Sequence, residues 1–117
     1  MRDHRSLHAW QETRAVVLGV IDLAHTGWKP WASALFSQLQ RASLSVQLNI
    51  AEGYAYADSP SFRKDLSMAY GSAVETGDLL ELALEVEVVS QELGTVLLRR
   101  NQRSQRLLLG MIRRRNR

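Results

Sequence analysis

Between residues 60 and 87 of this 117-residue chain, apolar and small residues recur at alternating steps of four and three. Their positions are Phe62, Leu66, Ala69, Ala73, Thr76, Leu80 and Ala83. Because residues three and four apart share one face of an α-helix, this spacing predicts a helix that buries a continuous stripe against other helices. No segment alternates between apolar and polar residues for long enough to predict a strand.

Three further segments have helical spacing, and local signals indicate where each helix begins or ends. We expect helices over residues 7–25, 31–53, 60–87 and 90–113. The only prolines, Pro30 and Pro60, are expected at helix starts, where the missing N–H is not needed. We expect Ser59 and Ser90 to cap the third and fourth helices, and Gly53 to end the second helix in a left-handed conformation.

The core stripes of the other three helices follow the same spacing, with polar interruptions. The first stripe comprises Trp10, Val17, Ile21 and Ala24, interrupted by Arg14. The second comprises Leu35, Leu39, Ala42, Val46 and Ile50. The fourth comprises Leu93, Leu97, Arg100, Ser104, Leu107 and Met111. Helices with short connections in a chain of this length predict one all-α domain over residues 1–117, an antiparallel up-down-up-down four-helix bundle.

The sequence lacks the signatures of a catalytic or metal site. It contains no Cys, which excludes a disulfide framework, a thiolate metal site and a cysteine nucleophile. Asp3, His4 and His8 could bind a metal if this segment is helical, because His4 and His8 would share a face, but two His at a chain end are a weak ligand set, so we expect no metal. There is no Glu-x-x-His pair, Gly-rich phosphate loop or nucleophile elbow. We therefore expect no cofactor and no enzymatic activity.

The longest apolar run extends from Ala15 to Ile21, far short of the ~20 residues that a membrane-spanning helix needs. No small-residue cleavage site follows this run, so a signal peptide is not expected either. We therefore expect a soluble, cytoplasmic protein without a membrane partner.

Positive charge is concentrated at the C-terminal end, although the formal net charge is only +3. Residues 99–117 contain eight Arg and no acidic residue, whereas residues 75–92 contain six acidic residues and no basic one. We expect one side of the fourth helix, and then a tail over residues 113–117, to present Arg99, Arg103, Arg106, Arg113, Arg114, Arg115 and Arg117. Because Arg binds phosphate through paired hydrogen bonds, this segment predicts RNA or DNA as a partner. Alternatively, Arg99–Arg106 pair with the acidic part of the third helix.

The second and third helices have more apolar surface than a monomeric bundle needs. A second stripe on the second helix, opposite its core stripe, comprises Leu44, Leu48, Ala51 and Ala55. An extra edge of the third helix comprises Met68, Leu79, Leu82 and Val86. Trp28 and Trp31 add apolar area at the turn between the first two helices. Apolar faces of this extent favour burial against another subunit, so we expect a homo-oligomer.

A polar line lies between the two apolar stripes of the second helix, where its members should be partly buried. It comprises Arg41, Ser45, Asn49 and Glu52. Antiparallel pairing with the third helix would place Arg41 near Ser72 and Glu75, so we expect an Arg41–Glu75 ion pair beside Ser72. This network either fixes the register of helices and subunits or forms a ligand pocket. The absence of a nucleophile–base pair favours the structural role.

These polar residues belong to a pattern that resembles a known family. The pattern comprises the run from Gln38 to Gly53, which ends in Asn-Ile-Ala-Glu-Gly, then Ser-Pro-Ser-Phe at residues 59–62 and Gly-Ser-Ala-Val-Glu at residues 71–75. From about Leu7 to Leu93, the chain resembles the four-helix-bundle proteins encoded in bacterial large-subunit rRNA intervening sequences. The resemblance implies a bundle that assembles into a ring, commonly a pentamer, without an established enzymatic activity. Its genomic setting suggests nucleic-acid binding, although the Arg-rich end lies outside the shared pattern.

Together, these observations predict a non-enzymatic, homo-oligomeric, ring-like bundle that binds nucleic acid through its Arg-rich C-terminal segment. The alternative is a protein-interaction scaffold with no role in nucleic-acid binding. A third hypothesis is a small-molecule binder or enzyme that uses Arg41, Glu52 and Glu75.

Overall fold

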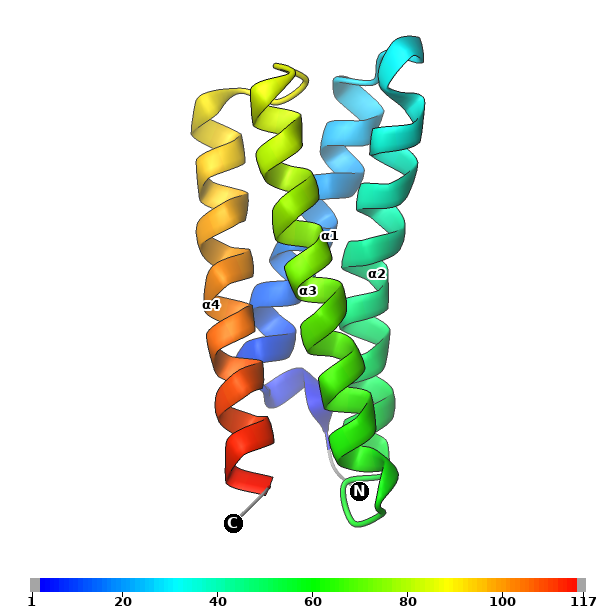
Figure 1. Ribbon diagram of the computed structural model, residues 1–117, viewed down its shortest axis with the longest axis vertical. Helices are drawn as coiled ribbons and strands as arrows, with labels where there is room; N and C mark the ends of the chain where they lie inside the picture. Colours follow the sequence, from blue (N-terminus) through cyan, green and yellow to red (C-terminus); the bar gives the residue numbers. More distant parts are fainter. Residues whose placement is uncertain (1–2, 116–117) are drawn as a thin grey trace.

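The computed structural model describes residues 3–115, with the backbone alone for Arg115. The described chain forms four long helices (Figure 1): α1 (His8–Thr26), α2 (Ser33–Ala55), α3 (Ser61–Glu85) and α4 (Gln91–Arg115). Short 3₁₀ turns, η1 (His4–Ser6) and η2 (Pro30–Ala32), precede α1 and α2. The expected all-α four-helix fold is confirmed, and each helix end lies within two residues of its expected position.

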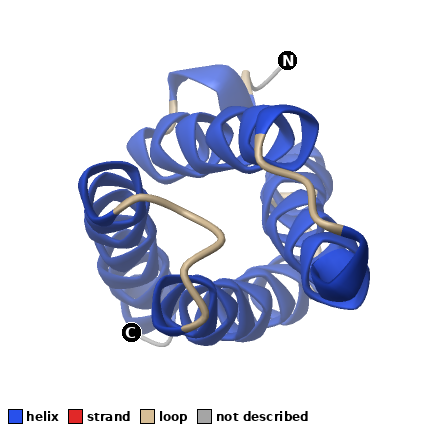
Figure 2. Cartoon of the chain, turned by 90° about the horizontal axis from the view of Figure 1, so that it is seen from above, coloured by secondary structure: helices blue, strands red, loops and turns tan. Residues whose placement is uncertain are grey.

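The four helices surround a common core in a square arrangement, seen from the end in Figure 2. Each helix packs against the next one along the chain, and α4 also packs against α1. Figure 1 shows that successive helices run in opposite directions. The bundle is 44 Å long and 20 by 19 Å across. The first turn of α3 and the last turns of α4 therefore lie at the same end of the molecule.

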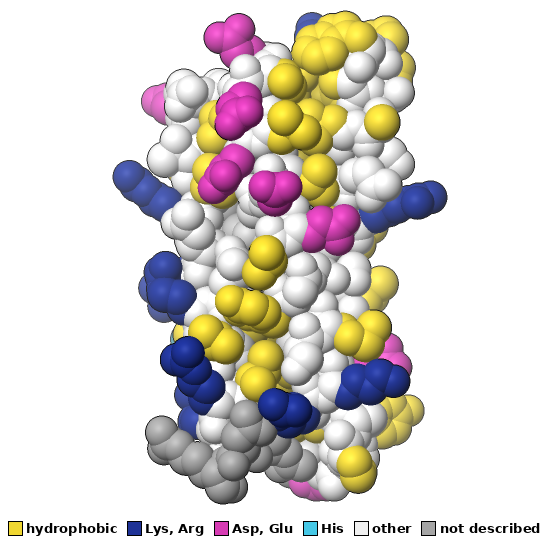
Figure 3. Space-filling model, in the orientation of Figure 1, with side chains coloured by type: hydrophobic (Ala, Val, Ile, Leu, Met, Phe, Trp, Pro, Cys, Tyr) yellow, Lys and Arg dark blue, Asp and Glu magenta, His cyan; other side chains and the backbone are white. Residues whose placement is uncertain are grey.

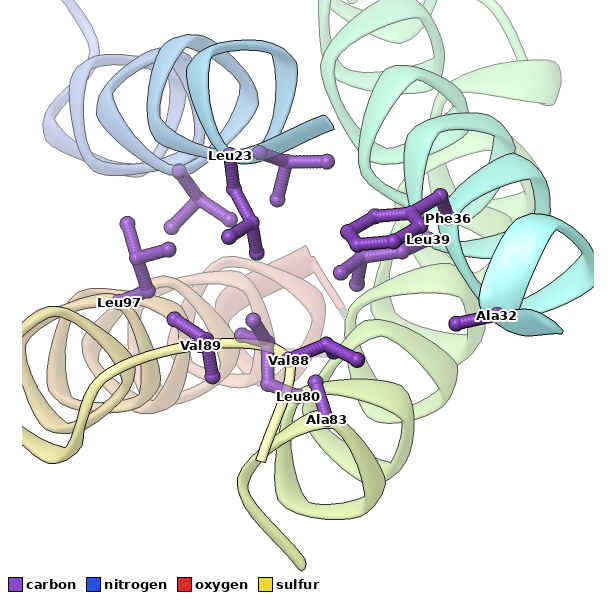
Figure 4. Close-up of a cluster of buried hydrophobic side chains, with 11 residues drawn as sticks. Leu23, Ala32, Phe36, Leu39, Leu80, Ala83, Val88, Val89 and Leu97 are labelled. Atoms are coloured by element: carbon purple, nitrogen blue, oxygen red, sulfur yellow. The ribbon is translucent and has the colours of Figure 1, made fainter. Parts of the chain in front are cut away.

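The core consists of two apolar clusters with a polar layer between them. One cluster includes Phe36, Leu39, Leu80 and Leu97, which point toward the bundle centre in Figure 4. The other includes Val46, Ile50, Leu66 and Leu108. In every helix, a buried polar residue falls between positions of the two clusters: Thr13, Ser43, Thr76, and both Asn101 and Ser104.

The core stripes expected for α2 and α3 are largely confirmed, whereas those for α1 and α4 are confirmed only in part, at residues such as Val17, Leu97 and Ser104. On α1, the buried residues are Ala9, Thr13, Val16, Val17, Val20 and Leu23. Ile21, which was expected in the core, is 44% exposed. On α4, Arg100 is exposed while Asn101 and Leu108 are buried. The buried faces of α1 and α4 include polar residues that hydrogen bond in the interior. Apolar spacing alone therefore predicted a stripe that only partly overlaps the buried face of each helix.

The expected serine caps form, whereas the expected role of Gly53 does not. The Ser90 hydroxyl accepts a hydrogen bond from the Leu93 N–H at 3.1 Å, and the Ser59 hydroxyl accepts one from the Ser61 N–H at 3.2 Å. Gly53 lies within α2, and no described glycine has a positive φ. A Cβ atom on Gly53 would approach the Asp65 Cβ to 3.0 Å. The glycine therefore permits close approach of α2 and α3 and does not end the helix.

Candidate nucleic-acid interface

The arginines of α4 lie on its solvent-facing sides. Arg99, Arg103, Arg106, Arg113 and Arg114 are all exposed. The expected tail begins later than Arg113, because α4 continues to Arg115. Arg117 lies outside the described residues, as does the side chain of Arg115. Because α4 is helical through Arg113 and Arg114, the side chains of these two residues project about 100° apart around the helix axis.

Two arginines of α4 are paired, but with α1 and not with the acidic part of α3. The Glu12 carboxylate lies 3.5 Å from an Arg100 guanidinium nitrogen and 3.7 Å from one of Arg103. The suggested pairing with α3 is therefore incorrect for these residues. Among the described residues, Arg99, Arg106 and the Arg113–Arg114 pair have no ion-pair partner. Their charges remain available to an external anion.

Two further cations lie at the same end of the bundle and were not recognised from the sequence. Arg63 and Lys64 occupy the first turn of α3, are exposed, and make no ion pair with a described residue. The opposite directions of α3 and α4 bring this turn to the same end of the bundle as the last turns of α4. The antiparallel topology, which the sequence did predict, was the signal that could have identified them.

Charge is therefore separated along the bundle axis. We define the basic end as Arg63, Lys64, Arg106, Arg113 and Arg114. Figure 3 shows most Lys and Arg side chains of one face in the lower half and its acidic side chains mainly in the upper half. The acidic side chains near the other end include Asp78, Glu81, Glu85, Glu87 and Glu92, all exposed. A polyanion would therefore be attracted to the basic end of the bundle and repelled by the acidic end.

Arg5 and the N-terminal histidine add little to this surface. The Arg5 side chain lies 3.0 Å from the Asp3 carboxylate. Hydrogen bonds from the Arg5 side chain and backbone hold the pKa of Asp3 below its ordinary value. The negative charge of Asp3 therefore offsets the positive charge of Arg5. The His4 ring packs edge-on against Trp10. The described residues contain no cluster of three or more His, Asp or Glu that could hold a metal ion.

The polar line between α2 and α3 forms a smaller network than expected. The hydroxyls of Ser45 and Ser72 lie 2.9 Å apart, and the Asn49 amide donates to the Ser45 carbonyl at 2.8 Å. These residues are half-buried, whereas Arg41, Glu52 and Glu75 are exposed. The expected Arg41–Glu75 ion pair is absent from the described structure. The network is therefore limited to the serines and Asn49, while the longer side chains extend into solvent.

Exposed apolar side chains flank this polar line. We define the apolar edge as Leu44, Leu48, Met68 and Leu82, which are all exposed, Leu48 by 60%. Of the other residues expected at an oligomer interface, Ala55 is exposed and Ala51 is half-buried. Leu79 is also half-buried because it packs on the first core cluster. Trp31, which is 68% exposed, lies in η2, immediately before α2.

The fold and the matched sequence identify the family. The family model of the 23S rRNA-intervening sequence protein matches residues 5–110. The chain belongs to this family. The match extends beyond the expected limit at Leu93, so Arg99, Arg103 and Arg106 lie within the family region, while Arg113 and Arg114 follow it. A search of curated proteins found no match to the chain. No helix in the described part is long and apolar enough to cross a membrane.

Proposed function

We propose that this protein is a non-enzymatic homo-oligomer that binds RNA through the basic end of its bundle. The observation that supports this proposal is the gathering, at one end, of exposed cations that have no ion-pair partner among the described residues: Arg63 and Lys64 from α3 and three arginines from α4. Guanidinium groups form paired hydrogen bonds with phosphate, and their spacing on rigid helices favours contact with successive phosphates.

RNA is the favoured nucleic acid because the family is described by the ribosomal RNA segment with which it is associated. Contacts made by arginine to phosphate do not distinguish sequences. We therefore expect binding that depends weakly on sequence and falls steeply as the salt concentration rises, since bound cations release counterions from the nucleic acid.

Self-association would strengthen this binding. The apolar edge is positioned to pack against a neighbouring subunit, and the hydrogen-bonded Ser45–Ser72 pair holds α2 and α3 together behind it. Closed assemblies bury such a face on every subunit. A ring built this way repeats the basic end once per subunit, which multiplies the contacts available to one RNA strand.

The experiment compares two variants with the same net charge. Arg113→Gln with Arg114→Gln removes two cations from the basic end, and Arg41→Gln with Lys29→Gln removes two exposed cations elsewhere. We expect the first variant to bind a mixed-sequence RNA more weakly. The slope of log affinity against log salt should also fall by about 1 for each phosphate that the variant no longer binds. The second variant should behave as the parent. Equal affinities and equal slopes for both variants would refute the proposal.

The exposed Trp31 and the apolar edge also fit a scaffold that binds another protein. A partner protein that is retained after nuclease treatment, together with no measurable RNA affinity, would favour this second function.

A further inference from the structure

The outer groove between α3 and α4 contains two adjoining hollows. The first, of about 230 Å³, is lined by Tyr70, Gln102, Gln105, Arg106 and Leu109. We call it the tyrosine hollow. The second, of about 330 Å³, shares Gln102 and Gln105 with the first and has Asp78 and Glu81 on its wall. The groove therefore leads from acidic side chains, through amides and a tyrosine, to an arginine of the basic end.

The tyrosine hollow contains polar side chains whose hydrogen-bonding groups are not all used by other described residues. Buried Asn101 donates its amide to the Ala73 carbonyl at 2.8 Å and to the Gln105 side-chain oxygen at 3.3 Å. Because the Gln105 oxygen is engaged, its NH₂ group remains the free donor. The side chains of Gln102 and Arg106 form no hydrogen bond with another described residue.

This set of groups matches the chemistry of a nucleotide. We propose that the tyrosine hollow binds one unpaired nucleotide of a single-stranded nucleic acid, an inference that rests on the proposed function. The base lies against Tyr70 and Leu109, the amides of Gln102 and Gln105 contact its polar edge, and Arg106 binds the adjoining phosphate. Stacking on an aromatic ring, with side-chain contacts to the base edge, is the usual way that proteins recognise unpaired bases.

The surrounding charges determine where the rest of the strand lies. Asp78 and Glu81 repel phosphates from the second hollow. On the other side, Arg63 and Arg113 continue the positive surface beyond Arg106. The strand therefore extends from the tyrosine hollow toward the basic end and not along the whole groove.

The hollow stays accessible in an assembly formed through the apolar edge. Tyr70 and Met68 are two residues apart on α3, so their side chains point to nearly opposite sides of that helix. The side with Met68 and Ser72 faces α2, whereas Tyr70 faces the groove with α4. Subunit contact and nucleotide binding therefore use different sides of α3.

The test separates base recognition from charge. Fluorescence anisotropy measures the affinity for an RNA decamer, a DNA decamer of the same sequence, and an abasic decamer of equal charge. We expect the parent protein to bind the base-bearing RNA about 5- to 100-fold more tightly than the abasic strand, which is the effect of stacking one base. The DNA decamer shows whether the sugar also contributes.

Tyr70→Leu removes the aromatic ring while keeping apolar contact with the core cluster that Tyr70 packs against. We expect it to bind the base-bearing strand about as weakly as the abasic one, whereas Tyr70→Phe retains the preference. Gln105→Glu keeps the side-chain length but replaces the free donor with a negative charge, so it should weaken binding too. Tyr56→Leu alters an exposed tyrosine outside the hollow and should leave every affinity unchanged.

The outcomes distinguish the two proposals. If the parent binds base-bearing and abasic strands equally, or if folded Tyr70→Leu and Gln105→Glu both bind as the parent does, the nucleotide site is refuted. If the Arg113→Gln, Arg114→Gln variant still weakens binding in that case, the proposed function survives without this site. If no decamer binds, both proposals fail.

Discussion

At the scale of single residues, the bundle depends on buried polar side chains that hydrogen bond between helices. Thr13 and Ser104 share a hydrogen bond of 2.7 Å between α1 and α4, and the Asn101 amide on α4 donates to the Ala73 carbonyl on α3 at 2.8 Å. Because a buried hydroxyl without a partner is costly, sliding one helix past another would leave these groups unsatisfied among apolar side chains. The polar layer therefore specifies the register of α4 against α1 and α3.

Thr13→Val tests this role, because it keeps the shape of the side chain and leaves the Ser104 hydroxyl without its partner. We expect the free energy of unfolding to fall by about 1 to 3 kcal/mol, measured by urea denaturation. Adding Ser104→Ala removes the orphaned hydroxyl, so the double variant should lose less than the sum of the two single losses. Additive losses would show that the hydroxyls do not act as a pair.

At the scale of helices, the sequence predicted where each element begins and ends better than which face it buries. The serine caps Ser59 and Ser90 are local signals, so they could be read directly. The buried faces of α1 and α4 depend on partners distant in sequence. Thr13 looks like a surface residue until Ser104 is known to lie opposite it, and the same holds for Asn101 and the Ala73 carbonyl.

Two glycines test how closely the helices pack. Gly53 lies where α2 meets α3, and an added Cβ would lie 3.0 Å from the Asp65 Cβ, whereas a Cβ on Gly71 would meet nothing within 4 Å. Alanine favours a helix by up to about 1 kcal/mol over glycine, so Gly71→Ala should raise the thermal midpoint. Gly53→Ala should lower it, because overpacking costs about 1 to 3 kcal/mol. A rise in both midpoints would show that the packing at Gly53 is not tight.

At the scale of the whole molecule, the candidate site depends on topology. The sequence located the arginines of α4, but the basic end also includes Arg63 and Lys64, which are about 50 residues away along the chain. Likewise, Tyr70 and Arg106 line one hollow only because α3 and α4 are antiparallel neighbours. The expected network around Arg41 was larger than the observed one. The pairing of two helices can be predicted from the sequence, but it does not show which of their long side chains extend into solvent.

The proposed assembly is tested by Leu48→Glu, which places a charge in the apolar edge. Leu48 is 60% exposed, so the fold of one subunit should tolerate the change. Burying a leucine is worth about 1.5 to 3 kcal/mol, and a carboxylate at the same place must lose its hydration, so each interface in the assembly is weakened. We expect light scattering to give a smaller mass for this variant, with the helix content unchanged by circular dichroism. Leu18→Glu is the matched control, because Leu18 is 54% exposed on α1, outside the apolar edge. An unchanged mass for Leu48→Glu, or an equal loss of mass for Leu18→Glu, would contradict assembly through the apolar edge.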